Sequence, residues 1–294
     1  MRESRKLPHK TFSAEMGEYM VDANAKQIDE YSAHVVTQGN EDTVASFFAT
    51  LTNLLVENAI VRHFMTDDTP EQVLELYSES ANAAANFFEL KLNPGKQLRY
   101  EWRNQSCEIA VPEKISGHTE YSILWQGITS ALIAGNLDKL KFLVRVPLDT
   151  RNAGIGPFDL RVMVLQSLCR GDEKSQAELI NTLRGLEPTR NLDSKSVHSK
   201  DQMMLALCEN DPAEISDAVT KCLSAHARFY DSNGRNMRFN VHGLIASDVL
   251  AMLVLARIRR IRFGTDIKDG YIPRELLDAS QSRIDMLSAN LNFD

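Results

Sequence analysis

The sequence predicts an all-α protein in which antiparallel helical hairpins stack as a solenoid-like array. Apolar residues recur at three- and four-residue spacing through most of the 294 residues, which is the period of an amphipathic helix. A helix–turn–helix pattern also recurs three times after residue 118. No linker is long enough to separate autonomous domains. We therefore expect one compact unit over 1–294, which divides, if anywhere, into an N-terminal helical layer (1–115) and a repeat array with a C-terminal cap (116–294).

The N-terminal third has clear helix signals. Residues 12–36 and 41–65 both carry apolar side chains at helical spacing, and the second segment is the more apolar. Thr69-Pro70-Glu71 then combines an N-cap residue, a first-turn proline and an acidic residue, so it predicts the start of a third helix. The turn residues of "LNPG" (92–95) end that helix.

Residues 96–113 are the exception to the helical pattern. Leu98, Tyr100 and Trp102 alternate with polar residues. The same alternation follows the turn-like "RNQS" in Cys107, Ile109 and Val111. Alternation with period two is typical of strands, so this stretch is either one small β-hairpin or an extended loop.

The three repeated segments are "TSALIAGNLDKL" (129–140), "LQSLCRGDEKSQ" (165–176) and "MLALCENDPAEI" (204–215). In each, a helix ends at a residue that tolerates the left-handed conformation, and the next residue caps a second helix. The helix-ending residues are Gly135, Gly171 and Asn210, and the capping residues are Asn136, Asp172 and Asp211. An alternative is that any helical hairpin selects such turn residues, which leaves the all-α prediction unchanged.

The chain ends with a long apolar helix predicted over 243–263, followed by "DGYIPRELL" (269–277). Asp269-Gly270 is a turn signal, Tyr271 is an aromatic anchor, and Pro273 suits the first position of a short closing helix. The last element of a helical array has one face without a neighbour. We therefore predict that Tyr271 and Pro273 belong to a structural cap on that face.

Composition and charge narrow the class of protein. Hydrophobic content is 43%, charged content is 25% and the net charge is −7, which disfavours nucleic acid or an anionic membrane as partner. The arginines of "RIRRIR" (257–262) crowd the end of a helix, where they complement its dipole. No signal peptide and no charge-free membrane span are apparent, and the four cysteines form no CxxC pair. We expect a reduced, metal-free, cytoplasmic protein.

Motifs that carry chemistry are missing from the sequence. The glycines of "NAGIGPFDLR" (152–161) lack the residues of a P-loop and do not follow a strand. "DSNGRN" (231–236) resembles a calcium loop, but its glycine comes too early and no glutamate closes it. We therefore predict that the protein is not an enzyme and uses no cofactor.

Four segments resemble the bacterial immunity protein 49 family of polymorphic toxin systems. They are "SALIAGNLDKLKFL", "LALCENDP", "GLIASDVLAMLVLARIRRIRFG" and the ending formed by Tyr271, Pro273, Arg274, Leu276 and Leu277. The resemblance covers about the C-terminal 170 residues. It implies an all-helical, non-enzymatic protein that binds and neutralises a cognate toxin, and we expect it to occlude the toxin's active site. The alternative is a tetratricopeptide-like scaffold or peptide-binding regulator.

The segment "CENDPAEISDAV" (208–219) is the candidate for the toxin-facing surface. Asp211 is expected to be an N-cap, and Glu214 and Asp217 share one helix face at i, i+3. Neither Glu209 nor Asp217 has an evident structural role in the sequence. We therefore predict that Glu214, Asp217 and Glu209 contribute to partner binding through their negative charge.

Overall fold

The computed structural model describes residues 12–37, 41–115, 120–148, 156–186, 192–232, 240–261 and 270–288. It is mostly helical (76%) with one small antiparallel hairpin, so the all-α prediction is confirmed. In chain order the described elements are α1 (Ala14–Val36), α2 (Glu41–Met65), α3 (Pro70–Lys91), β1 (Gln97–Trp102), β2 (Gln105–Ala110), α4 (Glu120–Ala134), α5 (Leu137–Leu143), α6 (Pro157–Arg170), α7 (Glu173–Arg184), α8 (Leu192–Glu209), α9 (Pro212–Ser232), the 3₁₀ turn η1 (Val241–Gly243), α10 (Ser247–Ile258) and α11 (Arg274–Ser288).

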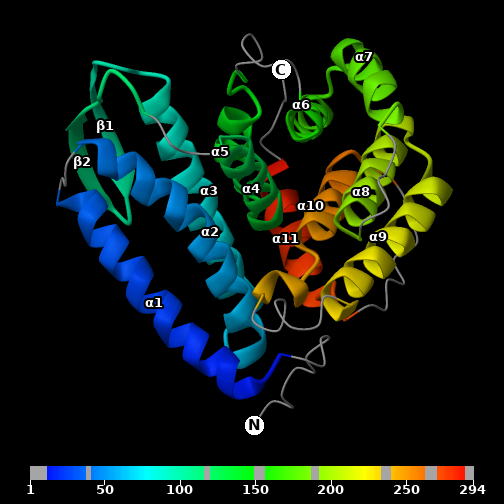
Figure 1. Ribbon diagram of the computed structural model, residues 1–294, viewed down its shortest axis with the longest axis horizontal. Coiled ribbons are helices and arrows are strands. Elements are labelled where there is room, and N and C mark those ends of the chain that lie inside the picture. The colour runs from blue at the N-terminus through cyan, green and yellow to red at the C-terminus, as the bar shows by residue number, and fades with distance from the viewer. Residues whose placement is uncertain are drawn as a thin grey trace.

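The helices form two arms joined by a central group (Figure 1). Helices α1, α2 and α3 and the hairpin form one arm, and α6, α7, α8 and α9 form the other. Helices α4, α10 and α11 lie between them. Helix α4 packs against α3 on one side and α10 on the other, and α11 packs against α3, α4 and α10. The central group therefore contacts elements of both arms.

The first arm begins and ends its helices where the local signals predict. The Thr69 side chain accepts a hydrogen bond from the amide of Gln72, and the Gln72 side chain accepts one from the amide of Thr69. This capping box fixes the start of α3 at Pro70. Helix α2 packs between α1 and α3, with Phe48, Leu51 and Leu55 fully buried.

Helix α2 has the length and composition of a possible membrane span, but it contains Glu57 and Arg62, so the expectation of no charge-free span is not contradicted. Its segment Thr43–Met65 is long and apolar enough to cross a bilayer by length and composition alone. Most of the segment is buried inside the protein, where it packs against the neighbouring helices. Such apolarity is typical of a core helix, because a helix covered on most sides needs few polar residues.

Residues 97–110 form the hairpin, which settles the alternative that the sequence left open. Strands β1 and β2 pair antiparallel, with Tyr100 opposite Cys107 and Trp102 opposite Gln105. Arg103 and Asn104 both have positive φ angles (47° and 63°), which is typical of the type I′ turn that closes two-residue hairpins. The rings of Tyr100 and Trp102 each pack edge-on against Phe48, with centroids 5.4 Å apart. The apolar face of the hairpin therefore covers α2.

The three predicted helical turns have the predicted backbone conformation. Gly135, Gly171 and Asn210 have φ angles of 65°, 68° and 55°. The Asn136 side chain accepts a hydrogen bond from the amide of Lys139 at the start of α5. At the start of α9, Asp211 accepts one from the amide of Ala213 at 2.8 Å. Each turn joins two helices that pack on one another: α4 with α5, α6 with α7, and α8 with α9.

The last apolar helix is shorter than predicted at its start. The chain forms the turn η1 at Val241–Gly243, and α10 begins only at Ser247. The amide of Ala246 donates to the carbonyl of Tyr271 at 3.0 Å. In a continuous helix this amide would bond to the carbonyl four residues earlier. The contact with the C-terminal segment therefore replaces the first turn of the predicted helix.

Tyr271 and Pro273 lie at the junction between α9, α10 and α11. The Tyr271 ring is half-buried and packs edge-on against His226 of α9, with centroids 5.0 Å apart. Pro273 is buried directly before α11, and its carbonyl accepts from the amides of Leu276 and Leu277. Pro273 therefore takes the capping position of α11, whereas the sequence predicted that it would be the first residue of the helix.

The variant Tyr271→Ala tests the cap. It should lower the free energy of unfolding by about 2 kcal/mol, less than a fully buried aromatic, because the ring is partly exposed. Chemical denaturation followed by helical circular dichroism measures the change. Tyr19→Ala is the control, since Tyr19 on α1 is 69% exposed and should cost little. Equal stability of the Tyr271→Ala protein and the wild type would show that Tyr271 is not part of a structural cap.

Candidate functional site

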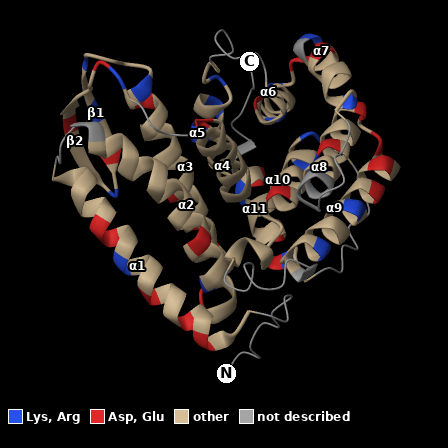
Figure 2. Cartoon of the chain, viewed as in Figure 1, with Lys and Arg blue, Asp and Glu red and all other residues tan. Residues whose placement is uncertain are grey.

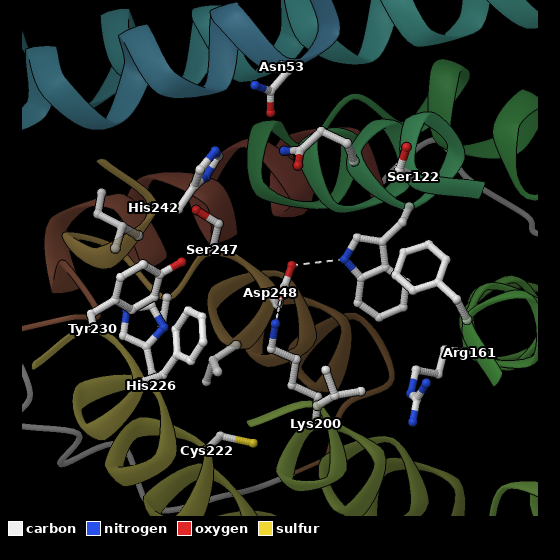
Figure 3. A pocket seen from close by; sticks show the side chains of 18 residues that line it. Asn53, Ser122, Arg161, Lys200, Cys222, His226, Tyr230, His242, Ser247 and Asp248 are labelled. Atoms are coloured by element: carbon white, nitrogen blue, oxygen red, sulfur yellow. Dashed lines mark hydrogen bonds and ion pairs between the residues drawn. The ribbon is translucent and has the colours of Figure 1, made fainter. Parts of the chain in front are cut away.

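A cavity lined in part by aromatic residues lies between the two arms and holds about 400 Å³ (Figure 3). We call it the inter-arm cleft. Helices α2, α4, α6, α8, α9 and α10 all contribute side chains to it. The residues that line it are Asn53, Ser122, Trp125, Gln126, Phe158, Arg161, Val197, Lys200, Cys222, His226, Phe229, Tyr230, His242, Ile245, Ala246, Ser247, Asp248 and Val249.

Asp248 is the charged group at the centre of the cleft. Its Oδ1 accepts a hydrogen bond from the Trp125 indole nitrogen at 2.9 Å, and its Oδ2 pairs with the Lys200 ammonium (Figure 3). Asp248 lies in the first turn of α10, where the helix dipole favours a carboxylate. One carboxylate thus connects α4, α8 and α10.

The pair changes the pKa of both partners. Burial works to raise the pKa of Asp248, but the Lys200 ammonium and the Trp125 hydrogen bond outweigh it and lower that pKa. Burial likewise works to lower the pKa of Lys200, and the Asp248 carboxylate outweighs it, so the pKa is raised. Each shift favours the charged form, so both groups are ionised at neutral pH.

The other polar side chains of the cleft wall also have partners. Arg161 of α6 forms a two-pronged ion pair with Asp201 of α8, at 2.5 and 2.7 Å. The Cys222 thiol donates to the carbonyl of Ser199, and burial raises its pKa to about 11. Cys222 is therefore a protonated wall residue and not an activated nucleophile. His226 lies 3.2 Å from the carbonyl oxygen of Gly243, as expected of a core histidine.

Within the described part of the chain, no group of three His, Cys, Asp or Glu residues could hold a metal ion. The turn "DSNGRN" lies largely outside that part. The four cysteines are free. Of the arginine cluster, Arg257 donates to the carbonyl of Leu277 and so ties α10 to α11. Arg262 lies outside the described residues.

The predicted acidic residues lie on another surface, a groove between α7, α8 and α9. Glu209 pairs with Arg184 of α7, and Asp217 pairs with Lys221 at 2.5 Å. The premise that these two carboxylates have no structural partner is therefore wrong. Glu214 is fully exposed, and the neighbouring Glu209 carboxylate raises its pKa. The three acids share one groove, but the cations beside them offset much of their charge.

Sequence patterns did not identify the inter-arm cleft. Trp125, Lys200 and Asp248 come from three separate helices and meet only in the folded chain. The one local signal was Asp248 itself, a charge inside the apolar run "LIASDVLAMLVLA". A buried charge needs a partner, so such a residue could have pointed to an ion pair, although not to its members.

The sequence matches the family model described as Immunity protein 49 over residues 66–276. The match begins before α3, so it extends further toward the N-terminus than the predicted C-terminal 170 residues. Every residue that lines the inter-arm cleft, except Asn53 of α2, falls within the matched range. No curated protein and no solved structure gives a significant match.

Asp248→Asn tests whether the ion pair supports the fold. The amide keeps the shape of the side chain but leaves the Lys200 ammonium without its counter-charge. Removing one partner of a fully buried pair costs about 3 kcal/mol or more. The side chains of Lys200 and Asp248 are only partly buried, so we expect a smaller loss of about 2 kcal/mol in the free energy of unfolding at neutral pH, measured by chemical denaturation. Asp217→Asn is the control, because its exposed pair with Lys221 should contribute less than about 1 kcal/mol.

The loss should also depend on pH. The pKa of Asp248 is lowered in the folded protein, so its contribution is complete above the ordinary aspartate pKa and disappears as the pH falls through the folded value. The pKa of Lys200 is raised, so its contribution is lost only when the pH rises through its folded value. The difference between wild type and Asp248→Asn should therefore shrink in acid. A difference of equal size at neutral and acidic pH would contradict this assignment.

Proposed function

Because the chain belongs to the immunity protein 49 family, we propose that it neutralises its cognate toxin by lying over the toxin's active site. Membership implies toxin neutralisation, and such proteins are typically non-enzymatic inhibitors. The match over residues 66–276 is the observation that carries the proposal. Occlusion is supported by the packed helical core, since a rigid surface binds without the entropic cost of ordering itself.

The negative net charge of this protein favours a toxin with a basic surface. The net charge is −7, and acidic residues recur along α1 and on helices α7, α8 and α9 (Figure 2). Complementary charge accelerates the encounter of two proteins more than it strengthens the final complex. We propose that the groove with Glu209, Glu214 and Asp217 takes part in this attraction. Nucleic acid and anionic membranes do not fit a surface of this sign.

We also propose that the protein works in the cytoplasm, where a delivered toxin would meet its target. The four free cysteines fit this location, because thiols persist in the reducing cytoplasm. Burial raises the pKa of Cys169 to about 12 and that of Cys208 to about 11, so both stay protonated and resist oxidation.

Co-expression tests the function. We expect a toxin gene next to the gene for this chain, and its toxin domain should stop growth of cells that lack the immunity protein. Growth should recover when this chain is produced, and the purified proteins should form a complex in which the toxin is inactive. Growth arrest that persists despite abundant folded protein would contradict the proposed function.

A charge-reversal variant tests the acidic groove. Glu214→Lys combined with Asp217→Lys should leave the fold intact, because both side chains are exposed. Association with the toxin domain should slow about threefold or more at low salt and much less at high salt, because salt screens the attraction. Stopped-flow mixing at two salt concentrations measures the rates.

The matched control for this variant is Glu15→Lys with Glu18→Lys on α1, which changes the net charge equally at exposed positions. An equal slowing by both variants would mean that total charge, and not the groove, governs association. An unchanged rate at low salt would remove the groove from the toxin-binding surface.

A further inference from the structure

We propose that the inter-arm cleft is an anchor site for one loop of the toxin. It would receive an apolar or aromatic side chain of that loop together with the adjoining peptide group. The identity of the partner rests on the proposed function, but the chemistry of the occupant follows from the cleft. Three properties of the cleft indicate which chemical group would bind there: spare hydrogen-bonding capacity, neutral charge and aromatic walls.

Hydrogen-bonding capacity comes from the ion pair. The Lys200 ammonium has three N–H donors, and its bond to Asp248 uses one of them. Each oxygen of Asp248 accepts one hydrogen bond, from Trp125 or from Lys200, and can accept a second. The side chains of Lys200 and Asp248 are 29% and 24% exposed, so both still reach the cleft. The Lys200 ammonium can therefore donate to the C=O of a peptide group, and the neighbouring Asp248 carboxylate can accept from a peptide N–H.

Charge in the cleft is already balanced. Lys200 neutralises Asp248, and Asp201 neutralises Arg161. His242, which also acts on Asp248, lies 3.6 Å from a carboxylate oxygen of Glu57 of α2. An ionic ligand would therefore bring a buried charge without a counter-charge, which is costly. A neutral amide adds hydrogen bonds without adding charge.

The walls supply the apolar contact. Trp125 of α4 and Phe158 of α6 lie beside each other, with ring centroids 6.3 Å apart. Phe229 and Tyr230 of α9 also line the cleft. Phe158 is 42% exposed, more than any other phenylalanine among the described residues. Exposed aromatic side chains next to a concave site are typical of the residues that dominate protein interfaces. The volume of about 400 Å³ lies within the usual range for a ligand pocket.

The cleft is separate from the acidic groove. Helix α8 turns Val197 and Lys200 into the cleft but Gln202, Ala206 and Glu209 into the groove. The two surfaces therefore make independent predictions. The groove would act on the rate of encounter, and the cleft would act on the lifetime of the complex.

A blocked amino acid tests the chemistry without the toxin. N-acetyl-phenylalaninamide carries an aromatic side chain with neutral amides, and phenylacetate and phenethylamine carry the same ring with a negative or a positive charge. Trp125 fluorescence reports binding once the buried Trp102 is replaced by phenylalanine. We expect a saturable change with the amide and about tenfold weaker binding of both ions. No saturable binding of the amide, or equal binding of either ion, would overturn the assignment.

The toxin domain tests the surface. Phe158→Ala should weaken its binding by about tenfold or more, mainly through faster dissociation, because loss of a central aromatic contact typically has this effect. Tyr19→Ala removes an exposed aromatic from α1, on the other arm, and should leave affinity unchanged. Both variants should unfold like the wild type. An affinity of Phe158→Ala equal to that of the wild type would overturn the anchor site and leave the proposed function standing. A wild-type protein that fails to bind the toxin would instead reject the proposed function, and the blocked amino acid would still decide the chemistry of the cleft.

Discussion

The geometry of the cleft depends on a partly buried carboxylate that is held by two partners. Asp248 lies in the first turn of α10 and accepts hydrogen bonds from Trp125 of α4 and Lys200 of α8. A charge removed from water is stable only if its partners stay in place, so this contact fixes the relative position of three helices. Every residue of α10 from Val249 to Ala256 is buried. The ion pair therefore anchors a largely buried helix of the central group and also supplies polar atoms to the cleft.

Where the fold is set by contacts within a few residues, it could be predicted from the sequence. The start of α3 follows from Thr69 and Gln72, and the left-handed turns follow from Gly135 and Asn210. The hairpin was predicted as one of two alternatives, because its alternation marks an extended segment but not its pairing. The start of α10 was predicted wrongly, since the carbonyl of Tyr271, a residue 25 positions later, takes the amide of Ala246. Long-range backbone contacts of this kind leave no local pattern.

The difference between local and long-range contacts also explains which parts of the candidate site could be predicted from the sequence. The acidic residues of α9 were found because they form a local pattern, and Asp211 caps the helix as predicted. Two ion pairs were missed for different reasons. Arg184 reaches Glu209 of α8 from another helix, whereas Lys221 lies only four residues after Asp217 on α9, a spacing that the sequence does show. The cleft was missed for the first of these reasons, since Trp125 and Asp248 are 123 residues apart in sequence. Sequence similarity supplied the class of function, and only the folded chain supplied a surface with defined chemistry.

The central claim is that the toxin meets this protein at the inter-arm cleft. Photo-crosslinking tests it most directly, with the photoreactive residue benzoylphenylalanine in place of Phe158 in one protein and of Tyr19 in another. Irradiation of each protein with the toxin domain should give a covalent product from position 158, at the mouth of the cleft, and none from position 19. A product from position 19, with none from position 158, would contradict the account.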